Sequence, residues 1–340
     1  MGEMLEMRVN LLPWLALASA AKCSLLEKML EDFRGTTIGG VMQPNLDSGS
    51  RLNDSPVNIR RASIADLRYY ANVAGASMCS DKKLVDFSCQ PYCGAVANGT
   101  AKTPPTKGIR MVEIIRDMVT GVKGYIAVLD SRREIVVSTS GERMQSNRAA
   151  LSMPALFPLD VNYSNNNNKN IRTKGVAVQA LLYATANRLL EQYSATLRKL
   201  AFSGRTSGYK IVFTGHSIGA EMAAFSMIVA HHKLDIPWQR IRYIGYGMTR
   251  IGNREFVRWF NQQDLEATHV INYDEKVVYF YPIAYNYQYI GNEVFINKDG
   301  SVRICNNAYF EDPDCNLSEI DGKFREPHVQ AFDTEFGMVC

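Results

Sequence analysis

The sequence has little net charge, few histidines and no long apolar stretch beyond its first 21 residues. Its 340 residues carry a formal net charge of +4, and five of them are His. This charge is too small to indicate a nucleic-acid partner, and no basic cluster is interleaved with aromatic residues. No later segment has the ~20 apolar residues that a transmembrane helix needs. We therefore expect neither a nucleic-acid-binding protein nor a membrane-spanning one.

The N-terminus predicts secretion. Residues 9–21 are apolar but too short to span a bilayer. They end in Ala18-Ser19-Ala20, the small-x-small pattern of a signal-peptide cleavage site. The alternative is a buried N-terminal helix. We expect residues 1–21 to be a signal peptide and the protein to be extracellular.

The next segment, residues 22–61, is polar and weakly patterned, and it ends in Arg60-Arg61. Such a dibasic pair is typical of the end of a propeptide, although an ordinary charged surface pair explains it equally well. Regular patterning starts at Ala62. We expect a propeptide over residues 22–61 and one folded domain over residues 62–340.

The seven cysteines lie far from the histidines in sequence, so a metal site is not indicated. In an oxidising compartment six of them become candidates for disulfides. Cys23 is the odd one, since it lies just past the predicted cleavage point. N-glycosylation sequons agree with a secretory route, and they begin at Asn53, Asn98, Asn162 and Asn316.

Strand patterns alternate with long helical patterns after residue 62. Such alternation predicts a mostly parallel sheet flanked by helices, which is an α/β fold. The predicted helices span residues 62–78, 177–200 and 221–231, and the predicted strands span residues 124–129, 134–137, 209–214, 241–246, 269–273, 293–297 and 301–305.

A nucleophile elbow is indicated at residues 215–219, which read Gly-His-Ser-Ile-Gly. The pattern G-x-S-x-G is weak alone, but here a buried strand leads into it and a helix follows it, as the motif requires. Side chains at Gly215 and Gly219 would collide with neighbouring backbone in so sharp a turn. We therefore predict Ser217 as the nucleophile.

A serine nucleophile needs a general base, and elimination among the histidines indicates His328. In this fold the acid and then the His follow the nucleophile along the chain. The other four histidines do not fit this order. His216 lies inside the elbow, His231 and His232 end the next helix, and His269 precedes the best candidate for the acid. The alternative is that His328 is an ordinary surface residue.

The acid that orients the base is predicted at Asp274. This residue ends the strand predicted over residues 269–273, and the carboxyl ends of strands face the site in open α/β sheets. Asp264 is the rival, but it falls between strands.

These residues make the chain similar to the fungal class 3 triacylglycerol lipases, over about residues 62–340. Residues 211–219 (IVFTGHSIG) resemble their strand and elbow, and residues 246–256 (YGMTRIGNREF) resemble their G-x-P-R-V-G-N-x-x-F segment. Residues 268–282 resemble their acid-bearing stretch, with Asp274 on the Asp, and His328 matches their terminal His. The resemblance implies an α/β-hydrolase fold stapled by the disulfides Cys79–Cys340, Cys89–Cys93 and Cys305–Cys315.

The resemblance also implies an oxyanion hole, made by the backbone N–H groups of Ile218 and Glu142. In the family a Ser or Thr stands where this chain has Glu142, so a carboxylate replaces a hydroxyl beside developing negative charge. The family's Pro is Thr249 here. A lid is expected near residues 143–156, although the apolar residues there are equally consistent with ordinary core contacts.

The function expected from these features is hydrolysis of carboxylic esters by a Ser–Asp–His triad through an acyl-enzyme, without a metal or an organic cofactor. The resemblance implies a lipid substrate, triacylglycerol above all, met at an oil–water interface. One alternative is an esterase for soluble esters such as aromatic plant-wall esters. The other is a lipase-like binding protein with weak catalysis, which Glu142 favours.

Overall fold

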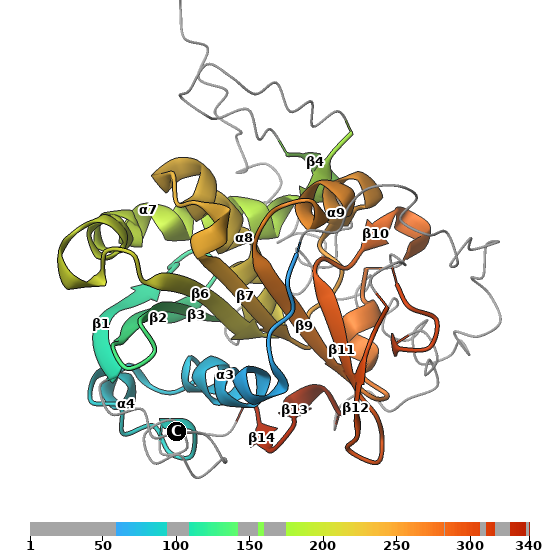
Figure 1. Cartoon of the computed structure of the whole chain (residues 1–340), viewed down its shortest axis with the longest axis horizontal. Coiled ribbons are helices and arrows are strands. Elements are labelled where there is room, and N and C mark those ends of the chain that lie inside the picture. The colour runs from blue at the N-terminus through green and yellow to red at the C-terminus, as the bar shows by residue number, and fades with distance from the viewer. Residues whose placement is uncertain are drawn as a thin grey trace, which may run out of the picture.

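The fold is built on a central eight-stranded sheet, which in this computed structural model has the order β1-β2-β3-β6-β7-β9-β11-β12. The five strands from β3 to β11 run parallel, and β1, β2 and β12 are antiparallel to their neighbours (Figure 1). The structure describes residues 59–93, 109–141, 156–159, 175–281, 283–306, 311–316, 327–337 and 340.

Most strands of this sheet lie where the sequence predicts them. The pair of strands before the elbow, the three buried strands and the final hairpin are all confirmed, whereas β1 was not predicted. The strands are β1 Ile109–Arg116, β2 Lys123–Leu129, β3 Glu134–Ser140, β6 Lys210–His216, β7 Ile241–Tyr246, β9 Glu266–Asn272, β11 Asn292–Ile296 and β12 Val302–Ile304.

Helices cover both faces of the sheet, as the predicted fold class requires. α7 (Ala180–Phe202) and α8 (Ile218–Leu234) lie on one face, and α3 (Ile64–Ala76) lies on the other (Figure 1). Successive residues of β6 therefore enter different cores. Ile211 and Phe213 pack with α7 and α8, while Val212 packs with α3. Burial on both faces explains why the parallel strands are continuously apolar.

A second, smaller sheet of four short strands was not predicted. It has the order β10-β8-β5-β4, and its strands have only two or three residues each. The helix predicted over residues 177–200 consequently begins three residues later, because residues 177–179 form β5.

The remaining strands and α-helices are β4 Leu156–Pro158, β5 Ala177–Gln179, β8 Gly252–Asn253, β10 Tyr287–Gln288, β13 Gln330–Ala331, β14 Thr334–Glu335, α4 Asp81–Val85 and α9 Arg254–Asn261.

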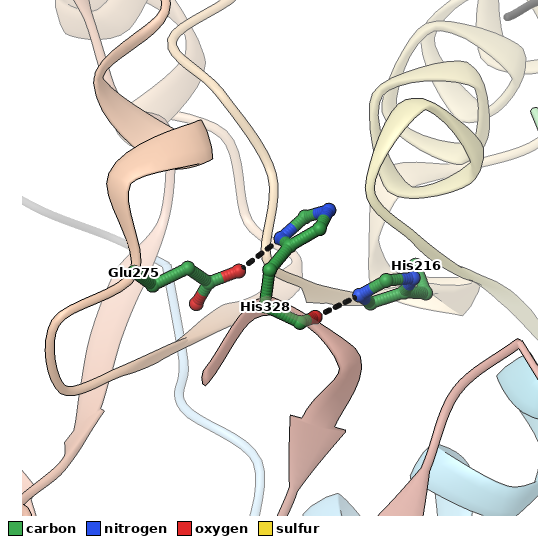
Figure 2. A group of neighbouring side chains, drawn as sticks. All are labelled: His216, Glu275 and His328. Carbon is green, nitrogen blue, oxygen red and sulfur yellow. Dashed lines mark hydrogen bonds and ion pairs between the residues drawn. The ribbon is translucent and has the colours of Figure 1, made fainter. Parts of the chain in front are cut away.

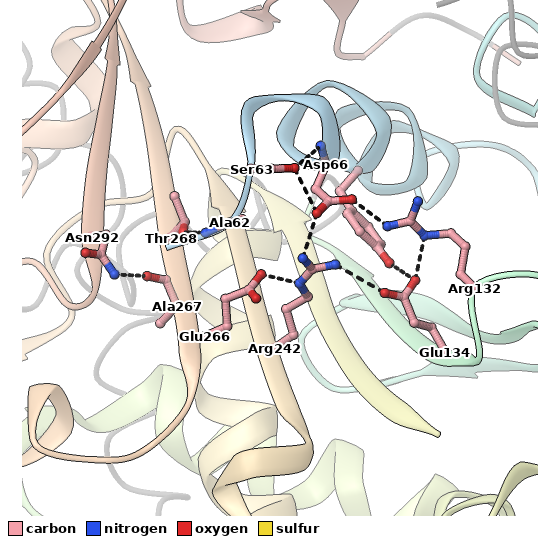
Figure 3. A network of polar contacts seen from close by, with 11 residues as sticks. Ala62, Ser63, Asp66, Arg132, Glu134, Arg242, Glu266, Ala267, Thr268 and Asn292 are labelled. Atoms are coloured by element: carbon pink, nitrogen blue, oxygen red, sulfur yellow. Dashed lines mark hydrogen bonds and ion pairs between the residues drawn. The ribbon is translucent and has the colours of Figure 1, made fainter. Parts of the chain in front are cut away.

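A network of ion pairs binds α3 to the amino ends of the parallel strands (Figure 3). Arg242 of β7 donates to Asp66 (2.7 Å), to Glu134 at the start of β3 (3.2 Å) and to Glu266 at the start of β9. Arg132 donates to Asp66 (2.5 Å) and Glu134 (2.8 Å). The network lies at the opposite ends of the strands from Ser217, so its contribution is to stability.

Replacing Arg242 by Ala is expected to lower the free energy of unfolding by about 3–5 kcal/mol, because it leaves Glu266 without its Arg partner and removes one of the two cations that pair with Asp66 and Glu134. Arg205→Ala is the matched control. Its ion pair with Asp130 has an Arg side chain that is 71% exposed, so about 1 kcal/mol or less is expected. Urea denaturation measures both values. Equal losses in the two variants would contradict this role for Arg242.

The dibasic pair predicted at the propeptide boundary runs beside β9. The N–H of Arg60 donates to the carbonyl of Leu265 (2.8 Å), and its carbonyl accepts from the N–H of Ala267 (2.9 Å). The N–H of Ala62 donates to Thr268 Oγ1 (2.8 Å). The segment around the pair is thus tied to the sheet. The predicted signal peptide and nearly all of the predicted propeptide lie outside the described residues.

The described residues contain three disulfides, and these join the cysteines that the resemblance pairs, namely Cys79–Cys340, Cys89–Cys93 and Cys305–Cys315. One predicted sequon does not fit the structure, because the side chain of Asn316 is buried and its Nδ2 donates to Glu293 (3.2 Å). A glycan on that nitrogen would require the side chain to give up this hydrogen bond and leave its buried position. The sequons at Asn53, Asn98 and Asn162 lie outside the described residues.

Within the described ranges, no helix combines the length and the apolar character needed to cross a membrane.

Candidate active site

The strand-to-helix turn at Ser217 has the strained backbone that a nucleophile elbow requires. β6 ends at His216 and α8 begins at Ile218, so Ser217 alone makes the turn, with φ 55° and ψ −130°. Such a conformation costs about 1–3 kcal/mol in a residue other than Gly and persists only where its surroundings enforce it. Here the N–H of Ser217 donates to the carbonyl of Tyr246 on the next strand (2.8 Å).

The two glycines of the elbow are required by close packing. A Cβ on Gly215 would overlap the backbone of Gly219 and lie 2.6 Å from the carbonyl oxygen of Thr139. A Cβ on Gly219 would overlap that same carbonyl. β3 therefore lies directly against the start of α8, which brings the turn after β3 to the nucleophile.

His328, the predicted general base, lies within hydrogen-bonding distance of Ser217. It belongs to a 3₁₀ turn, Pro327–Val329, and its Nε2 is 2.9 Å from Ser217 Oγ. Its Nδ1 is 2.5 Å from Oε1 of a carboxylate, that of Glu275 (Figure 2). A hydroxyl, an imidazole and a buried carboxylate thus form one continuous chain. This geometry allows the imidazole to remove the proton of the hydroxyl.

The carboxylate in this chain is Glu275 and not Asp274, where the sequence placed it. β9 ends at Asn272, one residue before the predicted strand end, and Asp274 adopts a left-handed conformation with φ 61°. That turn brings the next side chain, Glu275, to His328. The other candidate, Asp264, forms an exposed ion pair with Arg60. Because the strand was predicted to end one residue later than β9 does, the acid was assigned to Asp274 instead of Glu275.

Glu275 is held in place by burial and by the backbone. Its side chain is 2% exposed, and its Oε2 accepts from the N–H of Asn272 (2.9 Å). Burial raises the pKa of Glu275, and the hydrogen bond from His328 partly offsets this rise. An imidazolium at His328 would favour the ionised form of the carboxyl.

Gly247 was not identified from the sequence, yet it makes room for the acid. Its φ is 56°, and its N–H donates to the carbonyl of Val270 (2.9 Å). A Cβ at this position would overlap Glu275 Oε1 and lie 3.1 Å from His328 Nδ1. A longer residue here would push apart the acid and the base, and its backbone would be strained as well.

His216 holds the backbone of the catalytic-site histidine. Its Nε2 is 2.6 Å from the carbonyl oxygen of His328, and its ring stacks on Phe336 with centroids 4.0 Å apart. Burial, together with the nearby charge of His328, keeps the pKa of His216 well below its usual value, so the ring is neutral at pH 7. Asn272 Nδ2 donates to the carbonyls of Pro327 (3.0 Å) and Gln330 (3.2 Å). Both contacts fix the segment that carries His328.

The described part of the predicted oxyanion region lies beside the elbow. A Cβ on Gly141 would overlap the side chain of Ile218, so the end of β3 approaches the first residue of α8 closely. Glu142 itself lies outside the described residues, and so does nearly all of the predicted lid. Of that lid, Leu156 is described as the first residue of β4.

Two groups of side chains in the described ranges could offer metal ligands. One is His216, Glu275 and His328, whose ligand atoms all lie within 4.8 Å of one another. Their polar atoms already serve the hydrogen bonds given above. The other is Glu293 with Cys305 and Cys315. These two sulfurs are joined in a disulfide and are not thiolates.

Comparison with known proteins agrees with this geometry. The family model "Lipase (class 3)" matches residues 154–284. A curated relative, "Secreted mono- and diacylglycerol lipase 1" of Fusarium solani, is 24% identical over 259 residues, which cover 75% of this chain and 70% of that protein.

Solved lipase structures share the fold at low identity. A lipase from Rhizopus microsporus var. chinensis superposes with a TM-score of 0.66 at 17% identity, covering 84% of this chain and 96% of that one. Rhizomucor miehei triacylglyceride lipase gives a TM-score of 0.65 at 18% identity, covering 82% and 98%. The predicted α/β-hydrolase fold is thereby confirmed, and the predicted resemblance to the class 3 lipases is supported by the match over residues 154–284 and by the relative. The chain is thus similar to carboxylic ester hydrolases of that family.

Proposed function

We propose that the chain is a secreted acylglycerol lipase that uses Ser217 as nucleophile, His328 as general base and Glu275 as the orienting acid. The observation that carries this proposal is the continuous contact chain from Ser217 Oγ to His328 and on to Glu275. The strained backbone of Ser217 supports it, because such strain is kept at functional sites.

The mechanism follows from these two contacts. Ser217 Oγ attacks the ester carbonyl while His328 Nε2 takes its proton, and Glu275 stabilises the imidazolium that forms. The imidazolium then gives the proton to the leaving alcohol, and water releases the acyl group by the same steps. The backbone N–H groups of Ile218 and Glu142 would bind the oxyanion. Each such donor is worth about 2.7–4 kcal/mol of transition-state stabilisation.

The substrate class rests on the family and the relative. Class 3 lipases and a protein named as a mono- and diacylglycerol lipase are the matches, so esters of glycerol are the proposed substrates, with triacylglycerol implied by the resemblance. The relative is also named as secreted. This supports export of the chain. We propose residues 1–21 as its signal peptide and residues 22–61 as its propeptide. N-terminal sequencing of the exported protein tests both boundaries.

Labelling with a fluorophosphonate probe tests the catalytic proposal. The wild type is expected to react covalently, because the probe's phosphorus is attacked by an activated serine. Ser217→Ala is expected to lose the label. A matched control is Ser226→Ala, which removes a buried hydroxyl further along the same helix and should leave labelling intact.

Absence of label on folded wild type would favour the alternative of a lipase-like binding protein. Hydrolysis of dissolved esters at the same rate as emulsified ones would instead favour an esterase without a lid.

A further inference from the structure

A second buried carboxyl, that of Glu221, lies in the first turn of α8 and takes no part in the contacts described above. Glu221 is 2% exposed, and its N–H donates to the carbonyl of Ser217 (3.2 Å). Its Oε1 accepts two hydrogen bonds from Thr249, from the N–H (3.1 Å) and from the hydroxyl (2.6 Å). The helix N-terminus also favours a negative charge at this position.

The partner of Glu221 sits in the turn that borders the catalytic contacts. Thr249 lies two residues after Gly247, the glycine whose Cα packs against Glu275 and His328. The Pro that the family pattern has at position 249 could donate neither of the two hydrogen bonds, since it lacks both the N–H and the hydroxyl. Glu221 and Thr249 are therefore complementary, because the carboxylate accepts the two hydrogen bonds that Thr249 can donate and Pro cannot.

Among the described basic residues, two lie near the contacts of Glu221. The charge of His328 lowers the pKa of Glu221, whereas Arg250, which follows Thr249, is paired with Glu311. The other titratable groups coupled to it are phenols, those of Tyr243 on β7, Tyr281, and Tyr287 on β10. All three stay neutral at pH 7, because burial raises the pKa of each. A charge on Glu221 is thus felt chiefly by His328.

We propose that Glu221 is a positioning residue that, when ionised, supplies a second negative charge to the imidazolium of His328. This inference rests on the proposed function. During attack on the ester, His328 changes from neutral to cationic, so a fixed anion nearby lowers the energy of the transition state and not of the ground state. Glu275 stabilises the imidazolium by direct contact, and Glu221 stabilises it electrostatically without touching it.

The contribution depends on pH. Burial raises the pKa of Glu221 to about 7, while the hydrogen bonds from Thr249 and the charge of His328 act in the opposite direction. Below pH 7 the carboxyl is protonated and adds no charge. Above pH 7 it is ionised and stabilises the imidazolium. Ionisation of Glu221 should therefore make kcat/KM of the wild type rise with pH around pH 7.

Glu221→Gln tests the proposal, since Gln keeps the size and an oxygen that accepts from Thr249. We measure kcat/KM on a soluble short-chain ester between pH 5 and pH 9, with thermal unfolding as a check on the fold. At pH 8.5 kcat/KM of the variant is expected to be about tenfold lower than that of the wild type, because a charge that stabilises the imidazolium inside the protein has been removed. At pH 5.5 the two should differ by less than about twofold, because Glu221 is then neutral.

A loss of the same size at every pH would mean a merely structural role and would overturn the inference. So would unchanged kcat/KM at pH 8.5. A wild type that neither hydrolyses the ester nor reacts with the fluorophosphonate would refute the proposed function instead, and so the two failures are distinguishable.

Thr249→Val is the second variant, for the case that Glu221→Gln does not fold. It removes one donor to the carboxylate but leaves the carboxyl and the backbone N–H. Loss of a donor that favours the ionised form raises the pKa of the carboxyl. The pH-dependent rise in activity should consequently move to higher pH. A rise at the same pH as in the wild type would count against the charge of Glu221 as its source.

Discussion

Replacing Glu275 by Gln is expected to lower kcat by about 10⁴-fold while leaving the fold intact. The amide has nearly the shape of the carboxylate, but it carries no charge to stabilise the imidazolium of His328. It also presents an NH₂ group as readily as an oxygen, which favours the wrong tautomer of the ring. The measurement is kcat on a soluble ester near pH 8, with circular dichroism to confirm folding.

Asp274→Asn is the matched control, one residue earlier in the same turn. A change of only a few-fold is expected, because it is Glu275 whose carboxylate contacts His328 Nδ1. The opposite ranking, with Asp274→Asn severe and Glu275→Gln mild, would restore the assignment made from the sequence. Glu275→Asp should fall between these results, since the shorter side chain withdraws the carboxylate from the ring.

The central fold was predictable because its signals are strong and local. Buried parallel strands are continuously apolar, and β6 leads into the G-x-S-x-G turn while a helix follows it, which is the context that this motif requires. The order of nucleophile, acid and base along the chain then left His328 as the single suitable histidine. The prediction that Ser217 and His328 lie close together rests on this order along the chain alone.

Finer features depended on contacts that the sequence does not display. The acid was misplaced by one residue because strand ends are the least certain boundaries, and Asp274-Glu275 offers two carboxyls side by side. The strands of the small sheet have two or three residues, too few for a periodic pattern. His216 reads as part of the elbow, although its ring supports the backbone of His328 from 2.6 Å away.

The structure makes room for the longer side chain of Glu275, the acid that we propose, where the sequence predicted an Asp. Its carboxylate reaches past the turn after β7, where a side chain at position 247 would overlap Oε1. Gly247 and Glu275 therefore depend on each other, one giving the space that the other fills. Gly247 lies within the segment that resembles the family, yet the resemblance alone gave no reason for it.

Removing His328 is expected to lower kcat by about 10⁶-fold, which is the largest effect that we predict. Without the imidazole, the hydroxyl of Ser217 keeps its proton and is a poor nucleophile at neutral pH. Ser217→Ala should have an effect of the same size, because each variant abolishes the same step. The measurement is kcat of His328→Ala, of Ser217→Ala and of the double variant on one soluble ester.

The double variant shows whether Ser217 and His328 act in the same step. If nucleophile and base act as one unit, its loss is no greater than that of either single variant, and far below the product of the two. Losses that multiply would show that Ser217 and His328 act in separate steps, against the contact chain proposed for them. Residual hydrolysis above that in water is expected in all three variants, since the oxyanion donors and the bound substrate remain.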